Sequence, residues 1–155
     1  MSLIIQIEPP DISGRGVNRA LAISHLVYPK TWLSKYRKRH FTERGRTLYG
    51  YRKRTRDYIK RKRRLFKHNL PLVFTGRGRS DTQSGRAEAT HKRAAAVMQA
   101  QIFNIKPKGW PHPMREELTR VHQSEQDEMN RRAQVVADVE FQKLANRNTR
   151  KRTIR

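Results

Sequence analysis

The sequence predicts an α+β protein with basic helices in its N-terminal half, a small antiparallel sheet, a C-terminal helix and extended terminal arms. Two periodicities lead to this prediction. Apolar residues recur at three- and four-residue steps in 42–69 and 124–146, whereas side chains alternate between small and mixed types in 87–105. The 155 residues are enough for one domain, which we place at 1–146, with an N-terminal arm at about 1–12.

The first forty residues predict a short extended segment and two helical pieces. The apolar run Leu3-Ile4-Ile5-Gln6-Ile7 is typical of a strand or arm, and Pro9-Pro10 closes it. A helix is expected from near Ser13, until Pro29 stops or kinks it, because proline lacks an N–H and clashes with the preceding turn. A second short helical piece is expected over 31–40.

Residues 35–67 are the most unusual part of the chain. Sixteen of these 33 residues are Lys or Arg, and only Glu43 and Asp57 are acids. Aromatic residues are interleaved with the cations: Tyr36, Phe41, Tyr49, Tyr51, Tyr58 and Phe66. The spacing predicts one helix that is capped by Thr42 and ended by Asn69 and Pro71, with a basic outer face and an aromatic inner face.

The middle of the chain is expected to form extended structure. The apolar stretch 70–76 predicts a strand or an extended segment, followed by a turn at its glycines and a polar loop over 79–86. Residues 87–105 alternate as a half-buried strand does, although Ala94-Ala95-Ala96 also suits a helix. We favour strands because the run ends in β-prone residues.

The C-terminal third predicts a loop over 106–113, a last strand over 117–121 and a long helix over 124–146. Ser124 followed by Asp127 approximates a capping box at the start of that helix. Residues 147–155 contain five cations and no acid, and we expect a basic tail that is disordered or becomes ordered on a partner.

Charge and composition limit the function. The 36 basic and 13 acidic residues give a formal net charge of +23, which disfavours a compact isolated monomer. The chain has no cysteine, which excludes disulfides and thiolate metal sites. The apolar N-terminal run is too short for a signal peptide and no run is long enough to span a membrane, so we expect a soluble protein of a cytoplasm-like compartment.

Reactive groups are not arranged as an enzyme requires. The histidines are scattered, and we interpret the acids of 116–128 as complements to a helix dipole rather than a metal site. We therefore expect no enzymatic activity, no cofactor, no metal and no small-molecule ligand.

The basic segment has three interpretations: a solvated face, direct nucleic-acid binding, or a subunit that packs beside nucleic acid in a large assembly. No base-reading module is recognisable, which favours non-specific contact. The residues expected to contact nucleic acid or an acidic partner are Arg52, Lys53, Arg54, Arg56, Lys60, Arg61, Lys62, Arg63 and Arg64, with tail contacts from Arg147, Arg150, Lys151, Arg152 and Arg155.

The order of motifs over about 36–146 resembles the neck and tail-completion structural proteins of tailed bacteriophages. The matching motifs are His40-Phe41-Thr42, Leu48-Tyr49-Gly50-Tyr51 with Arg54, Tyr58-Ile59-Lys60-Arg61-Lys62, His68-Asn69-Leu70-Pro71-Leu72-Val73-Phe74-Thr75-Gly76-Arg77, and Glu117-Leu118-Thr119-Arg120-Val121 before a capped helix. At Gly78 the chain departs from the family, which usually has an apolar residue there.

The resemblance implies an α+β virion protein that forms a homo-oligomeric ring at the head-to-tail junction or the top of the tail. Double-stranded DNA would pass through the ring without being read, and portal, adaptor or tail proteins would be the neighbours. Such a protein would be assembled in the host cytoplasm and end in the virion. The alternative from the residues alone is an RNA-binding structural subunit of a ribosome-like particle.

Overall fold

The computed structural model describes residues 2–5, 14–73, 75–98, 103 and 113–153, of which 2–5 and 147–153 are described by their backbone. The fold is α+β and mostly helical, with a small antiparallel sheet, as the sequence predicts. In chain order the elements are β1 (Ser2–Ile5), α1 (Arg15–His25), α2 (Val27–Thr31), η1 (Trp32–Tyr36), η2 (Arg37–Phe41), α3 (Glu43–Leu48), α4 (Arg56–Phe66), α5 (Arg77–Asp81), η3 (Thr82–Ser84), β2 (Arg86–Ala89), β3 (Ala94–Val97), α6 (Arg115–Leu118) and α7 (Gln123–Thr153).

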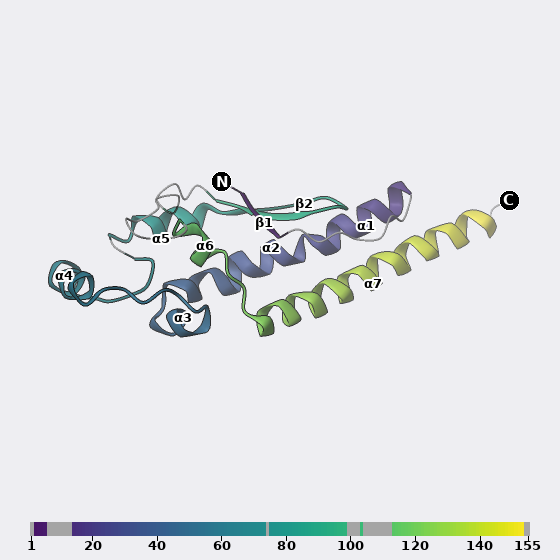
Figure 1. Ribbon diagram of the computed structural model, residues 1–155. Coiled ribbons are helices and arrows are strands. Elements are labelled where there is room, and N and C mark those ends of the chain that lie inside the picture. The colour runs from purple at the N-terminus through teal and green to yellow at the C-terminus, as the bar shows by residue number, and fades with distance from the viewer. Residues whose placement is uncertain (1, 6–13, 74, 99–102, 104–112, 154–155) are drawn as a thin grey trace.

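Four successive elements, α1, α2, η1 and η2, follow one another in the N-terminal half (Figure 1). The interruption that Pro29 predicts is present, and it lies at Leu26, between α1 and α2. α1 ends at His25, four residues before Pro29. In a continuous helix the ring of a proline clashes with the carbonyl group of the residue four positions before it. The helical path then resumes, and η1 is a π-helical turn.

The long helix α7 runs antiparallel to these elements along one side of the molecule (Figure 1). Gly16, near the start of α1, lies against Leu144, and a Cβ there would be 2.9 Å from Leu144 Cδ2. Further along, the Tyr28 hydroxyl donates to Asn130 Oδ1 at 3.0 Å. The close approach at Gly16 therefore sets how tightly the two helices pack.

The predicted end of the C-terminal helix near 146 is wrong, because α7 continues to Thr153. The physical reason is that 147–153 contain no Gly or Pro to break the helix, and their cations suit the negative end of the helix dipole.

The predicted capping box at the start of α7 is also wrong. The Ser124 hydroxyl is hydrogen-bonded to His122 Nδ1 at 2.8 Å, and the His122 N–H donates to Glu125 Oε2 at 3.3 Å. Glu125, three residues after His122, thus makes the capping contact that the sequence predicts for Asp127.

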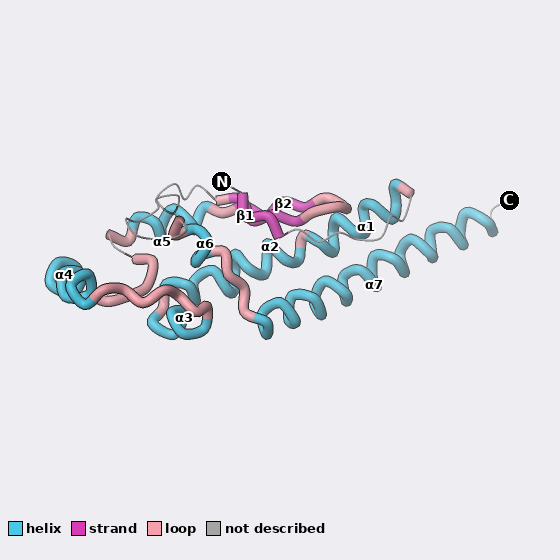
Figure 2. Tube along the Cα trace, in the orientation of Figure 1, coloured by secondary structure: helices cyan, strands magenta, loops and turns pink. Residues whose placement is uncertain are grey.

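The sheet has the order β1-β3-β2, and both pairings are antiparallel (Figure 2). Strands β2 and β3 form a hairpin in which Thr90 Oγ1 accepts from the N–H of Lys92 and of Arg93. Strands are confirmed within 86–97, and the helical alternative at 94–96 is wrong, because β3 is paired on both edges. The rest of the predicted alternation, 99–102 and 104–105, lies outside the described residues.

The N-terminal arm is described only in part. Residues 2–5 form β1, which pairs with β3 of its own chain, so the strand prediction is confirmed there. Residues 6–12 of the expected arm lie outside the described residues.

The single basic helix predicted from Thr42 to Asn69 is wrong, since it is divided into α3 and α4. The Thr42 cap is confirmed, because its side chain accepts from the Gly45 N–H. After α3 the backbone turns at Gly50, whose φ of 58° is in the left-handed region, and 51–55 lie outside any helix or strand, with Thr55 extended. Thr55 then caps α4 by accepting from the Tyr58 N–H.

Three other sequence predictions in the middle of the chain are wrong. Residues 70–73 and 75–76 form turns instead of a strand, with Leu72 at a φ of 54°. The polar loop 79–86 contains the end of α5, the turn η3 and the start of β2, while the expected strand 117–121 begins inside α6. Pro71 and the glycines favour turns here, and no described strand is available to pair with these segments.

The core lies between the sheet, the N-terminal helices and α7. Its largest fully buried side chains include Trp32, Tyr36 and Met129. On the sheet side, Ala94, Ala96 and Met98 are buried, and the two alanines let β3 lie close to α2. The alternation read from the sequence is thus confirmed for these positions.

Candidate nucleic-acid interface

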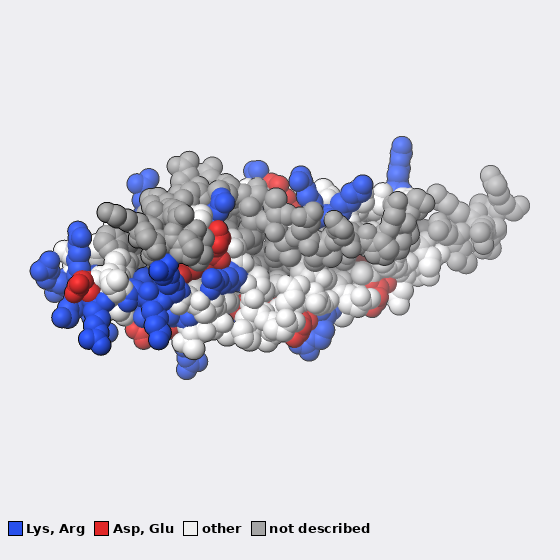
Figure 3. All heavy atoms as spheres, in the orientation of Figure 1, with Lys and Arg blue, Asp and Glu red and all other residues white. Residues whose placement is uncertain are grey.

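Lys and Arg side chains gather at the end of the molecule that carries α4 (Figure 3). α4 lies at that extremity, beyond α3 (Figure 1). Among its residues only Lys62 is buried, and Lys62 donates to the carbonyl oxygen of Leu70. The helix is therefore attached through a narrow strip around Lys62, and most of its surface faces outward.

Seven of the nine contact residues predicted in this region are exposed. These are Arg52, Lys53, Arg56, Lys60, Arg61, Arg63 and Arg64. Arg54 and Lys62 are placed differently, because both side chains are used within the fold. The outer surface that we define as the α4 basic face consists of Arg56, Lys60, Arg61, Arg63, Arg64 and Lys67.

Arg54 forms a two-pronged ion pair with the fully buried Glu117. Its Nη2 lies 2.7 Å from Oε2 and its Nη1 lies 3.3 Å from Oε1. The N–H of Arg52 also donates to Oε1, at 3.0 Å. Glu117 thus binds the non-helical segment between α3 and α4 through the backbone of Arg52 and the side chain of Arg54, which favours its departure from a helix.

Glu125 binds an earlier part of the same basic segment, at Tyr49 and Arg39. The Tyr49 hydroxyl donates to Glu125 Oε1 at 2.8 Å, and Arg39 Nη1 donates to the same oxygen at 3.0 Å. The ring of Tyr49 stacks on His40 at a centroid distance of 3.8 Å. Burial lowers the pKa of His40 to about 3, although a hydrogen bond to the Glu117 backbone partly opposes this shift.

Glu128 is the third acid that holds the basic segment. It accepts from Lys35 Nζ at 2.6 Å, from the Tyr36 hydroxyl at 2.5 Å and from Arg132 Nε at 3.0 Å. The hydrogen bond from Lys35, followed by that from Tyr36, lowers the pKa of Glu128 to about 2. Burial and the hydrogen bond to Glu128 raise the pKa of Tyr36 to about 12.

The role of these three acids differs from the one that the sequence predicts. Their place near a helix start predicts complements to a helix dipole, whereas Glu117 and Glu125 are buried ion-pair partners. One signal was available for Glu125, which precedes Met129 and Ala133 at steps of four residues and so shares their buried face. Nothing in the local spacing marks Glu117.

The predicted tail contacts are carried by the last turns of α7. Arg147, Arg150, Lys151 and Arg152 lie within the helix, and Arg155 lies outside the described residues. The α4 basic face and the end of α7 are at opposite ends of the molecule (Figure 1). The two predicted contact regions are therefore not brought together within one chain.

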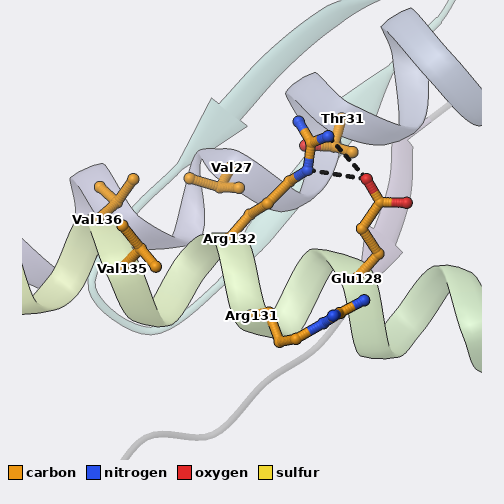
Figure 4. Close-up of a pocket in the computed structure, with 7 residues that line it drawn as sticks. All are labelled: Val27, Thr31, Glu128, Arg131, Arg132, Val135 and Val136. Atoms are coloured by element: carbon orange, nitrogen blue, oxygen red, sulfur yellow. Dashed lines mark hydrogen bonds and ion pairs between the residues drawn. The ribbon is translucent and has the colours of Figure 1, made fainter.

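An open groove of about 600 Å³ lies between α2 and α7 (Figure 4). Val27, Val135 and Val136 give it an apolar lining, and the ion pair of Glu128 with Arg132 lies at its side. The one carboxylate among its lining residues is already hydrogen-bonded to Lys35 and Tyr36. The groove therefore offers an apolar surface, and its lining contains no uncommitted carboxylate that could act with a base.

The described residues contain no metal site of the usual kind, because no three of their His, Asp and Glu side chains are grouped to hold a metal ion. No described helix combines the length and apolar character needed to cross a membrane. Comparison with protein-family models, curated proteins and solved structures found no match.

The first prediction concerns the buried ion pair. We expect Arg54→Met to lower the free energy of unfolding by about 3 kcal/mol or more, because Glu117 then keeps a buried charge without its partner. The double variant with Glu117→Gln should cost less than the two single changes added together, and denaturant unfolding of all three variants measures this coupling.

The matched control for the ion pair is Arg86→Met. Arg86 pairs with Glu88 at 2.7 Å on the exposed face of β2, so its loss should cost less than about 1 kcal/mol. Equal losses for Arg54→Met and Arg86→Met would contradict the structural role of the buried pair.

The second prediction concerns pH. Burial, with repulsion from Arg46 and Arg54, lowers the pKa of Lys62 from 10.5 to about 8. Between pH 8 and pH 10 the unfolded chain therefore binds more protons at this residue than the folded chain, and stability should rise with pH by at most about 1.4 kcal/mol per unit.

Lys62→Met should reduce this rise, whereas Lys60→Met, a change at an exposed lysine of the same helix, should leave it unchanged. Chemical unfolding at several pH values between 8 and 10 measures the three slopes. Identical slopes would show that Lys62 does not titrate in a buried site.

Proposed function

We propose that this protein is a non-enzymatic structural subunit of a tailed-phage virion, which forms a homo-oligomeric ring at the neck or tail top around passing DNA. The observation that carries the proposal is the α4 basic face, in which six exposed cations project from a helix that is attached to the fold mainly through Lys62. The motif resemblance over 36–146 supplies the place in the virion.

The distribution of acids supports a role in contact with an external polyanion. Three of the thirteen acids, Glu117, Glu125 and Glu128, form ion pairs within the chain, with Arg54, Arg39 and Lys35. In α4 itself Asp57 is the one acid. The charge of the α4 basic face is therefore left for a partner outside the chain, and duplex DNA supplies a dense array of phosphates.

The same charge explains why assembly would depend on DNA. Identical subunits that each carry +23 repel one another, so a ring gains stability when phosphates lie in its channel. Neighbouring portal, adaptor or tail proteins with acidic surfaces would act in the same way. The proposed localisation is accordingly the virion, after assembly in the host cytoplasm.

The third prediction tests the ring. In the presence of a short DNA duplex we expect light scattering to give a single mass that is a whole multiple of the chain mass, and electron microscopy to show closed rings. The matched sample without DNA should contain smaller species at low salt, where repulsion is strongest. A protein that stays monomeric with and without DNA would contradict the proposal.

The fourth prediction tests DNA contact. Changing Arg61 and Arg63 to Gln should flatten the dependence of log K on log salt by roughly two units, because about two fewer counterions are released. The control pair is Lys92 and Arg93, which are exposed in the β2–β3 turn and far in sequence from α4. An equal effect of both pairs would indicate diffuse attraction to the whole chain instead of contact by α4.

A further inference from the structure

The cations of α4 cover a wide arc of the helix rather than one stripe. Successive residues of an α-helix are offset by about 100°. On that basis five cations lie around an arc of about 160°, in the order Arg63, Arg56, Lys60, Arg64 and Arg61. Lys62, the buried residue, lies on the opposite side.

The width of this arc indicates where the negative charge of the partner lies. A helix that rests on a single phosphate backbone needs cations only along one line, toward that backbone. Here Arg56 and Arg63 lie on one flank of the arc, and Arg61 lies on the other flank. Cations on both flanks are matched by anionic charge on both sides of the helix, as at the walls of a nucleic-acid groove.

The shape of α4 fits one groove only. A helix with its side chains is about 10–12 Å across, which matches the major groove of B-form DNA at about 12 Å and exceeds its minor groove at about 6 Å. The eleven residues of α4 span about 16 Å, and the helix lies at one extremity of the molecule (Figure 1). The major groove of A-form RNA is too narrow and deep for such an element.

We propose that α4 enters the major groove of B-form DNA. Arg56 and Arg63 then face the phosphates of one strand, and Arg61 faces those of the other. Lys60 and Arg64, in the middle of the arc, face the base edges. This proposal rests on the proposed function in taking DNA as the partner, and it adds the groove, the orientation of the helix and the choice of DNA over RNA.

The same placement predicts what kind of sequence is read. Lys and Arg at the groove floor donate to guanine O6 and N7, whereas adenine is read by Asn or Gln. α4 contains neither Asn nor Gln. The interface would therefore bind any duplex through its phosphates and favour G·C-rich duplexes slightly through Lys60 and Arg64.

The experiment uses the full chain with two 20-base-pair duplexes of the same sequence, one of DNA and one of RNA. We expect binding to DNA to be tighter by about ten-fold or more at equal salt, because only its major groove admits the helix. At saturation, dimethyl sulfate should methylate guanine N7 in the major groove more slowly, while adenine N3 in the minor groove should react as in free DNA.

Changing Lys60 and Arg64 to Ala should remove the protection of guanine N7 while much of the affinity remains, because Arg56, Arg61 and Arg63 still contact phosphate. The control change of Lys92 and Arg93 to Ala should leave the protection in place. Protection that persists without Lys60 and Arg64 would overturn the proposed orientation.

The remaining outcomes separate this inference from the proposed function. Protection of adenine N3, or equal affinity for the RNA duplex, would overturn the groove assignment, and DNA-dependent rings would still support the ring subunit. Tighter binding to the RNA duplex would overturn both and favour a ribosome-like particle. Absence of binding to either duplex would also overturn both.

Discussion

The fold depends on the neutralisation of a basic segment by three acids from the far end of the chain. Glu117, Glu125 and Glu128 bind Arg54, Arg39 and Lys35 across sequence separations of 63, 86 and 93 residues. Two of these carboxylates are fully buried, and the cation that pairs with each offsets the cost of burying it. The ion pairs therefore fix the first part of the basic segment against α6 and α7.

This attachment explains the shape of the basic region. Residues 36–51 supply buried aromatic rings, with Tyr49 and Tyr51 beside His40, and the non-helical stretch that follows is bound by Glu117. Beyond Thr55 no comparable acid of the described chain lies over the helix, and α4 keeps its cations on the surface. The three acids thus anchor the first part of this run of basic residues to the fold, whereas most cations of α4 remain on the surface.

The candidate interface could be predicted in part. The excess of cations over 35–67 is a property of composition, and seven of the nine cations that it singles out in 52–64 are exposed. Composition could not separate Arg54 and Lys62 from their neighbours, since all nine residues look alike in the sequence. Arg54 is engaged because Glu117 is placed beside it by α6, and Lys62 is buried because the turn at Leu70 covers it. Both facts depend on segments that local periodicity does not connect.

The sequence by itself determined the net charge, the α+β class, the interruption before Pro29, the Thr42 cap and the strand character of Ala94–Val97, because each follows from composition or from the chemistry of a few adjacent residues. Only the tertiary structure decided that the basic helix divides at Gly50, that 70–76 turn instead of forming a strand, and that α7 continues to Thr153. The physical reason is the same in the first two cases. A local preference for regular structure is weak beside a buried carboxylate, or where no described strand is available for pairing, and such partners come from distant parts of the chain. In α7 the reverse holds, since a stretch without helix-breaking residues simply extends the helix that the packing of Met129 and Ala133 establishes.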